Sequence, residues 1–186
     1  MIELKELSKA FDGKPVLNGF NLQLESGCRY ALMGASGSGK TTLLNLLMGL
    51  EKPDSGSILK PDGLKISAVF QENRLLENLT PAANIRLVAD APLKTIHQLL
   101  LDMGIEPDSL DQPVKTYSGG MKRRVAIARA LLSDYDLLLL DEPYKGLDES
   151  TRQQVIAIVL QMTQGKTVLM VTHDPEDARE HQLIQL

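Results

Sequence analysis

The segment GASGSGKTT at residues 34–42 of this 186-residue chain restricts its possible folds more than any other feature. It follows an apolar segment at 29–34, RYALMG, which we expect to be a buried strand, and it precedes an apolar helix predicted at 42–50. Glycines permit a turn whose N–H groups point inward, and the helix directs its positive end to the same place. The pattern G-x-x-x-x-G-K-[ST] in this context therefore predicts a cradle for the phosphates of a nucleotide.

Individual residues of this loop suit different parts of that task. Gly34, Gly37 and Gly39 are expected to allow the backbone angles of the turn. Lys40 supplies a mobile charge for the β- and γ-phosphates, and the Thr41 hydroxyl is a ligand for Mg²⁺, which usually keeps waters and a phosphate ligand. The loop alone predicts a P-loop NTPase, a class that includes small-molecule kinases, GTPases, DNA-repair ATPases and transport ATPases.

A second feature is the segment LLLLDEP at 137–143, in which four leucines precede two acids. A buried strand here brings Asp141 to the carboxyl edge of the sheet, where ligands bind in open α/β folds, and we expect Asp141 to hold Mg²⁺ through a water. Glu142 is expected to point the other way along the pleat and to orient or deprotonate an attacking water. Because a kinase needs no such glutamate beside its metal ligand, the pair favours hydrolysis.

The periodicity of apolar residues predicts three parts. Alternating segments at the N-terminus, with a turn at Asp12-Gly13, favour an antiparallel sheet, whereas 73–129 is helical and contains four prolines. Alternating strands and helices in the last third indicate a parallel sheet covered on both faces. The predicted strands are 2–8, 20–25, 29–34, 65–71, 136–143, 166–174 and 182–186, and the predicted helices are 42–50, 91–104, 121–132, 149–165 and 174–180, with Ser150 or an acid capping 149–165 and Gly165 ending it.

Composition excludes several classes. The chain has 20 basic and 24 acidic residues, a net charge of −4, which argues against broad nucleic-acid binding, so we expect no nucleic-acid partner. Its one cysteine, Cys28, cannot form an internal disulfide and fits a reducing compartment. No apolar run approaches the roughly 18 residues needed to cross a bilayer, so any membrane role is expected to be peripheral and through another protein.

Further motifs carry a family resemblance. YSGGM at 117–121 closely resembles the LSGGQ signature of ABC-type ATPases, and Gln71 ends a predicted strand as the Q-loop of that family does. KGLD at 145–148 resembles the D-loop, and His173 follows KTVLMVT as the H-loop histidine does. Because these motifs occur in the right order over almost the whole chain, it resembles the nucleotide-binding subunit of an ABC transporter, of the short bacterial importer type.

The resemblance implies a fold and a set of site residues. The fold is α/β, a single domain over 1–186: a P-loop core with a mainly parallel sheet and an N-terminal antiparallel β subdomain (about 1–72 and 130–186) and an inserted α-helical subdomain (about 73–129). ATP and Mg²⁺ are the implied cofactors, with Phe11 stacking on adenine. The implied nucleotide-binding residues are Phe11, Gly34, Ser36, Gly37, Ser38, Gly39, Lys40, Thr41, Thr42, Ser118, Gly119 and Gly120, the catalytic residues Glu142, His173 and Gln71, and the metal-binding residues Thr41, Gln71 and Asp141.

The resemblance also implies partners. Ser118, Gly119 and Gly120 precede the apolar-periodic helix 121–132, and they would bind the γ-phosphate of ATP held by a second subunit. ATP binding would thus close a head-to-tail homodimer, or a pair with a homologous ATPase subunit. Integral membrane permease subunits would hold it in the cytoplasm, peripheral on the inner face of the cell membrane. We expect Lys122, Arg123 and Arg124 to form a solvated helix face.

Some residues depart from the family pattern. Tyr117 and Met121 replace the usual Leu and Gln, and Lys145-Gly146 stands where Ser-Ala is common. The chain is also short, so no C-terminal regulatory domain and trimmed subdomains are expected. Two alternatives remain open at this point: a soluble ABC-type ATPase not coupled to transport, and a small-molecule kinase of the P-loop class. The sequence indicates neither the cargo nor its direction.

Overall fold

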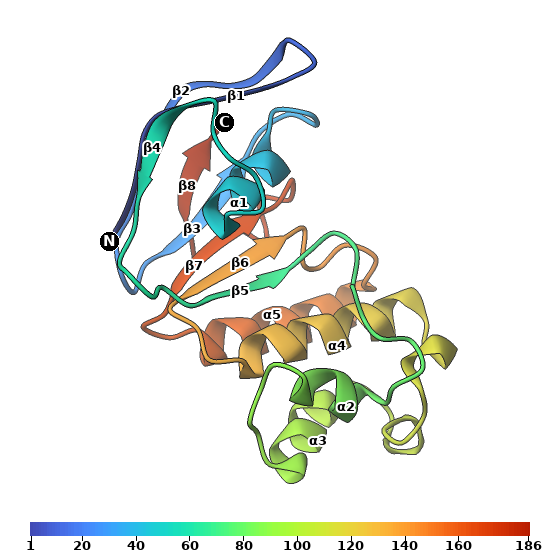
Figure 1. The fold of residues 1–186 in the computed structure, drawn as a ribbon. Coiled ribbons are helices and arrows are strands. Elements are labelled where there is room, and N and C mark those ends of the chain that lie inside the picture. Colours follow the sequence, from blue (N-terminus) through green and yellow to red (C-terminus); the bar gives the residue numbers. More distant parts are fainter.

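The computed structural model describes all 186 residues, and its centre is a parallel five-stranded sheet of order β5-β6-β7-β3-β8 (Figure 1). Helix α1 lies on one face of this sheet, and helices α4 and α5 lie on the other. The fold class expected from the sequence is therefore confirmed. The strands are β3 (Arg29–Met33), β5 (Ile66–Val69), β6 (Leu137–Asp141), β7 (Thr167–Val171) and β8 (Gln182–Gln185), and the helices are α1 (Lys40–Met48), α4 (Gly119–Leu132) and α5 (Glu149–Met162).

Strand β6 explains why four leucines occur in a row. Leu138 and Leu140 pack into the cluster beneath α4 and α5, whereas Leu137 and Leu139 pack into the cluster around α1. Successive side chains of a strand point to opposite faces, so a strand covered on both faces has no position for a polar residue. The strand then ends at Asp141, which places an acid at the carboxyl edge of the sheet.

An antiparallel sheet of order β2-β1-β4 packs over the α1 side of the core. The hairpin between β1 (Ile2–Phe11) and β2 (Lys14–Leu24) turns at Asp12 and Gly13, whose φ angles of 50° and 76° match the two-residue turn that the sequence predicts. Strand β4 (Ser55–Leu59) was not predicted, because its five residues SGSIL are mostly exposed and lack an apolar alternation.

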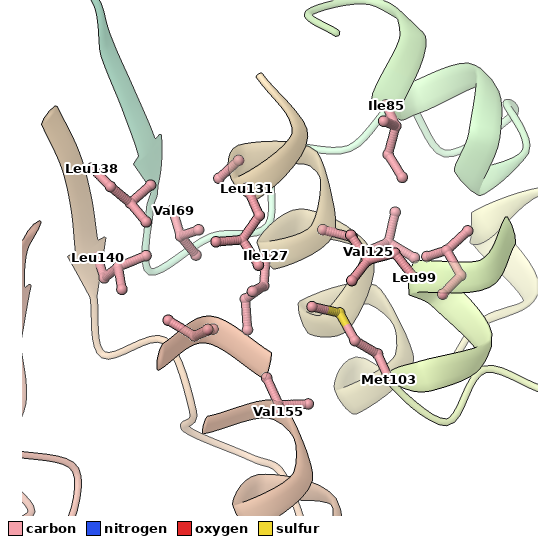
Figure 2. Packing of buried hydrophobic residues seen from close by; sticks show 14 of the residues in the cluster. Val69, Ile85, Leu99, Met103, Val125, Ile127, Leu131, Leu138, Leu140 and Val155 are labelled. Atoms are coloured by element: carbon pink, nitrogen blue, oxygen red, sulfur yellow. The ribbon is translucent and has the colours of Figure 1, made fainter. Parts of the chain in front are cut away.

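The helical lobe contains α2 (Pro81–Arg86), α3 (Leu93–Asp102) and two 3₁₀ turns at Pro107–Ser109 and Val114–Thr116. Helix α4 joins this lobe to the core, since one buried cluster includes residues from both (Figure 2). In Figure 2, Leu131 of α4 faces the strand that carries Leu138, whereas Val125 of the same helix lies beside Leu99 of α3. No helix of the protein has the length and apolarity that crossing a membrane requires.

One local prediction was wrong, and another was confirmed in part. Residues 174–180 form turns rather than a helix: Asp174 accepts the Glu176 N–H with its own side chain, and the remaining backbone bonds span three residues. These side-chain bonds compete with helical ones. Helix α5 is capped by an acid, one of the two caps expected, because Asp148 accepts the Thr151 N–H at 3.0 Å, but it ends at Met162 rather than at Gly165.

Candidate active site

The glycine-rich loop connects β3 to α1 and has the backbone that the sequence suggests at two positions. Gly37 and Gly39 have φ angles of 81° and 100°, which glycine adopts without strain. Gly34 has no positive φ and is required for a different reason. A Cβ there would lie 2.5 Å from the Leu186 carbonyl oxygen and 2.8 Å from Ser38 Oγ. Glycine is therefore needed because neighbouring atoms leave no room for a side chain, and not for the backbone turn that was expected.

Lys40 is the first residue of α1, and its side chain folds back across the loop. Its ammonium donates to the carbonyl oxygens of Gly34 at 2.9 Å and Ala35 at 2.7 Å, and the residue is only 6% exposed. These contacts hold a positive charge against the backbone of the loop. The arrangement suits the negative charge of a phosphate group.

The residues at the end of β6 and the start of α1 fit a magnesium ion. Thr41 Oγ1 donates to Asp141 Oδ2 at 2.9 Å, while Asp141 Oδ1 is buried and has no partner. Burial raises the pKa of Asp141 above its ordinary value, although the Thr41 hydrogen bond acts in the opposite direction. A cation would satisfy the unpaired oxygen. Because no three His, Cys, Asp or Glu side chains cluster in the chain, most of its other ligands would be neutral side-chain oxygens, phosphate oxygens and waters.

Glu142 does not continue the pleat of β6 as expected. Its φ is 46°, a left-handed conformation that ends the strand, and its N–H donates to the Val171 carbonyl oxygen at 2.9 Å. Its carboxylate lies between two other side chains, with Oε1 3.0 Å from His173 Nε2 and Oε2 accepting from Lys145 Nζ at 2.9 Å. Burial alone would raise the pKa of Glu142, but the Lys145 hydrogen bond and the neighbouring positive charges hold it below its ordinary value.

These parts meet in a cleft of about 260 Å³. Glu142 and the two other side chains predicted to be catalytic, Gln71 and His173, face the loop across it. Val16 also lines the cleft, and the sequence analysis missed it because only the fold brings β2 to Gly39, on which a Cβ would lie 2.7 Å from Val16 Cγ1. The predicted site residues that line this cleft are Ser36, Gly37, Gly39, Lys40, Thr41, Thr42, Gln71, Glu142 and His173.

Phe11 does not line this cleft. It ends β1, is 42% exposed, and has the Lys9 ammonium 5.1 Å from the centre of its ring. Its expected stacking on adenine is therefore kept as a proposal. Ser38 lies in the loop but points its hydroxyl into the interior, where it has no hydrogen-bond partner.

The segment 118–120 does not line this cleft, although Gly119 and Gly120 line a neighbouring one with Gln71 and Glu142. Ser118 caps α4 by accepting the Met121 N–H at 3.2 Å, and Ser118 and Gly119 are exposed. Tyr117, by contrast, is buried and donates from its hydroxyl to the Ser109 carbonyl oxygen at 2.6 Å, which anchors the segment to the helical lobe. The first N–H groups of α4 thus face outward with no helical partner of their own.

The basic segment after this turn was predicted wrongly. Arg123 is not part of a solvated face: it is 4% exposed and its guanidinium donates to carbonyl oxygens around the catalytic cleft. Arg124 donates to the carbonyl oxygens of Met103 and Gly104, and Lys122, which is half-buried like Arg124, pairs with Glu77 at 2.7 Å. Helical spacing could have indicated this, because Arg123 lies four residues before the buried Ile127.

The phosphate loop, the acidic strand end and their shared cleft define the chain as a P-loop ATPase. The exposed Ser118 and Gly119 stand at the N-terminus of its helix α4. A family model described as "ABC transporter" matches residues 17–145. The chain belongs to the ABC transporter family, and within it to the ATP-binding subunits, which hydrolyse ATP. The kinase alternative and the soluble ATPase alternative are not favoured.

Several relatives are similar over most of their length. The chain is 40% identical over 182 residues to an aliphatic sulfonates import ATP-binding protein of Pseudomonas syringae pv. syringae, with 96% of this chain and 76% of the relative covered. It is 39% identical over 176 residues to a thiamine import ATP-binding protein of Haemophilus influenzae, with 85% and 81% covered.

Solved structures agree with the fold. A dimeric structure of MJ0796, a bacterial ABC transporter cassette, superposes with a TM-score of 0.87 at 31% identity and covers 100% of this chain and 94% of the other. A dimer of the same cassette in a post-hydrolysis state with ADP and phosphate gives a TM-score of 0.86 at 30% identity, with the same coverage.

Proposed function

We propose that this chain is the ATPase subunit of an importer and that it works as a head-to-tail dimer. One observation carries the proposal: Gln71, Glu142 and His173 line one cleft with the phosphate loop, whereas Gly119 and Gly120 do not line it and lie with Gln71 and Glu142 in a neighbouring cleft of about 440 Å³. Because the N-terminus of α4 does not line the cleft of the phosphate loop in its own subunit, we infer that it meets the nucleotide held by a second subunit. The dimeric cassettes and the import proteins among the relatives support this.

In the proposed mechanism the loop residues 36–42 bind the phosphates of ATP, and Lys40 neutralises charge on the β- and γ-phosphates. Glu142 orients the attacking water and accepts its proton, and its lowered pKa keeps the carboxylate ionised at neutral pH. His173 and Gln71 hold the water and the γ-phosphate in line. Hydrolysis therefore depends mostly on positioning and electrostatics.

Mg²⁺ belongs to the same proposal. Thr41, Asp141 and Gln71 are the residues that would hold it, with the unpaired Oδ1 of Asp141 as the supporting observation. When bound, the ion supplies positive charge to the phosphate oxygens during transfer. The residues of the chain orient the attacking water toward the γ-phosphate.

The partners follow from the same geometry. Ser118, Gly119 and Gly120 of one subunit bind the γ-phosphate in the cradle of the other, with Phe11 stacking on the adenine and Asp148 near the dimer contact. The nucleotide is then a ligand that favours the closed dimer, and its hydrolysis releases the dimer. The helical subdomain at 73–129 passes this motion to permease subunits, with the chain at the cytoplasmic face of the membrane.

A phosphate-release assay with purified protein tests this function. We expect hydrolysis of ATP that requires Mg²⁺ and stops when the metal is chelated. Lys40→Ala is expected to abolish turnover because it removes the charge at the γ-phosphate, while the circular dichroism spectrum stays unchanged. A folded wild-type protein that releases no phosphate from Mg-ATP, or a Lys40→Ala variant with full activity, would exclude the proposal.

A further inference from the structure

Arg123 extends from α4 into the interior beside the catalytic cleft, and its guanidinium donates six hydrogen bonds. It is 4% exposed, yet no carboxylate pairs with it directly. Instead it is bonded almost entirely to the main chain, so it fixes backbone positions. Its acceptors are the carbonyl oxygens of Phe70, Gln71, Asp141, Glu142 and Pro143 and the side-chain oxygen of Asn73.

On the catalytic side, these bonds hold a strained backbone. Glu142 has a φ of 46°, a conformation that is unfavourable for a residue with a side chain and that persists only when its surroundings hold it. Nη2 of Arg123 donates to the carbonyl oxygens of Asp141 at 2.6 Å and Glu142 at 2.7 Å, and Nε donates to Pro143 at 2.9 Å. The guanidinium therefore helps to fix the direction of the Glu142 side chain.

On the other side, the same guanidinium holds the segment that carries Gln71. Nη1 donates to the Phe70 carbonyl oxygen and, at 3.3 Å, to that of Gln71. Arg129, six residues further along the helix, donates to the carbonyl oxygens of Asn73 at 3.1 Å and Arg74 at 2.7 Å. Residues 70–74 are thus attached to α4 by two arginines.

Helix α4 begins at the surface segment 118–120 and packs as a rigid element. Figure 2 shows its apolar side chains between the strands of the core and α3, and Val125 and Ile127 are fully buried. A packed helix moves as a unit rather than bending. A displacement of its N-terminus is therefore transmitted to Arg123, which lies one turn away.

We propose that Arg123 is a positioning residue that couples the N-terminus of α4 to Gln71 and Glu142 of the same subunit. Resting on the proposed head-to-tail dimer, the coupling works across sites. A γ-phosphate held by residues 118–120 belongs to the nucleotide of the partner, whereas Glu142 serves the nucleotide in the chain's own cradle. Occupancy of one site thereby sets the catalytic geometry of the other, which makes hydrolysis cooperative.

The same helix offers a matched control. Arg124 is also partly buried and donates to the carbonyl oxygens of Met103 and Gly104 in the helical lobe and, at 3.3 Å, to that of Gly120 one turn back on its own helix, but it contacts neither the Gln71 nor the Glu142 backbone. Arg123→Gln and Arg124→Gln therefore remove the same charge from neighbouring positions of one helix. Arg123→Lys is the conservative variant, since an ammonium keeps the charge but cannot reach both sides of the cleft with a planar fork.

The test measures the rate of phosphate release against Mg-ATP concentration for the full chain, together with ATP affinity in the absence of Mg²⁺ and thermal unfolding. For Arg123→Gln we expect kcat to fall about 10- to 100-fold, since small displacements of catalytic groups have effects of this size. The Hill coefficient falls toward 1 and ATP affinity is unchanged. Arg124→Gln keeps kcat and the Hill coefficient even where its unfolding temperature drops, and Arg123→Lys is intermediate.

Two results would overturn the coupling. One is a folded Arg123→Gln protein with the kcat and Hill coefficient of the wild type, and the other is an equal loss in Arg124→Gln. If Arg123→Gln does not fold, Arg123→Lys decides in the same way, with unchanged cooperativity counting against the coupling. A wild-type protein that hydrolyses ATP without cooperativity also contradicts it, whereas a wild-type protein with no ATPase activity overturns the proposed function itself.

Discussion

Replacing Glu142 by glutamine removes one negative charge from the catalytic cleft while conserving the shape of the side chain. The amide can still accept from Lys145, which lies 2.9 Å from Oε2, and the backbone bond to Val171 does not involve the side chain. Left-handed φ angles are as accessible to glutamine as to glutamate. The variant is therefore expected to fold as the wild type does and to lose only the group that accepts the proton of the attacking water.

The size of the effect follows from that role. A positioned general base contributes about 10²- to 10⁴-fold to rate, which corresponds to roughly 3–5 kcal/mol of transition-state stabilisation. Glu142 donates nothing to the phosphate loop, and Lys40 keeps its contacts with Gly34 and Ala35. Loss of a negative charge near the phosphates can only favour ATP binding. We therefore expect a fall in kcat by this factor with ATP affinity equal to or higher than that of the wild type.

Steady-state phosphate release at saturating Mg-ATP measures kcat, and equilibrium binding of ATP without Mg²⁺ measures affinity. Glu180→Gln is the control, because Glu180 is exposed and outside the cleft, and its activity should match the wild type. A Glu142→Gln variant with kcat within about threefold of the wild type would remove Glu142 from the role of general base.

Other substitutions test separate parts of the structure. Ser118→Arg should abolish cooperative hydrolysis while ATP still binds to single subunits, and an equal loss of binding would contradict the contact in trans. Ile127→Ala, at a fully buried position, should lower the free energy of unfolding in urea by about 2–5 kcal/mol, and a change below about 1 kcal/mol would contradict the packing. Burial lowers the pKa of His181 to about 4, from an ordinary value of 6.5, so the unfolded chain binds a proton first and the wild type loses stability as the pH falls between these values. His181→Gln should lack this component, and an identical pH dependence of unfolding in both proteins would refute it. Lys145→Ala removes a cation that lowers the pKa of Glu142, so the acidic limb of the kcat–pH profile should move to higher pH, and an unmoved limb would show that the ion pair has no such effect.

Local patterns predicted the parts of the fold that depend on neighbouring residues. The hairpin turn at Asp12-Gly13, the buried strand β6 and the glycine-rich loop each have a short-range cause, either a required φ angle or burial on both faces. The family resemblance grouped Gln71, Glu142 and His173, and they line one cleft because the carboxyl ends of parallel strands meet at one edge of the sheet.

The remaining features depend on contacts between distant residues. Strand β4 is held by pairing with β1 rather than by its own composition, and no local pattern marks it. Arg123 lay in a run of basic residues that suggested a wet surface, yet its donors are satisfied by carbonyl oxygens 18 to 53 residues away. The left-handed backbone of Glu142 likewise follows from its tertiary bonds, so a regular pleat was the wrong expectation.

The central claim is that ATP joins two copies of this chain through residues 118–120, and the mass of the Glu142→Gln protein in solution tests it most directly. Light scattering of this hydrolysis-deficient variant should give twice the chain mass of 20.4 kDa with Mg-ATP and the monomer mass with ADP. Adding Ser118→Arg should leave it monomeric in both. A protein that stays monomeric with Mg-ATP, or a dimer that forms regardless of nucleotide and of Ser118, would contradict the claim.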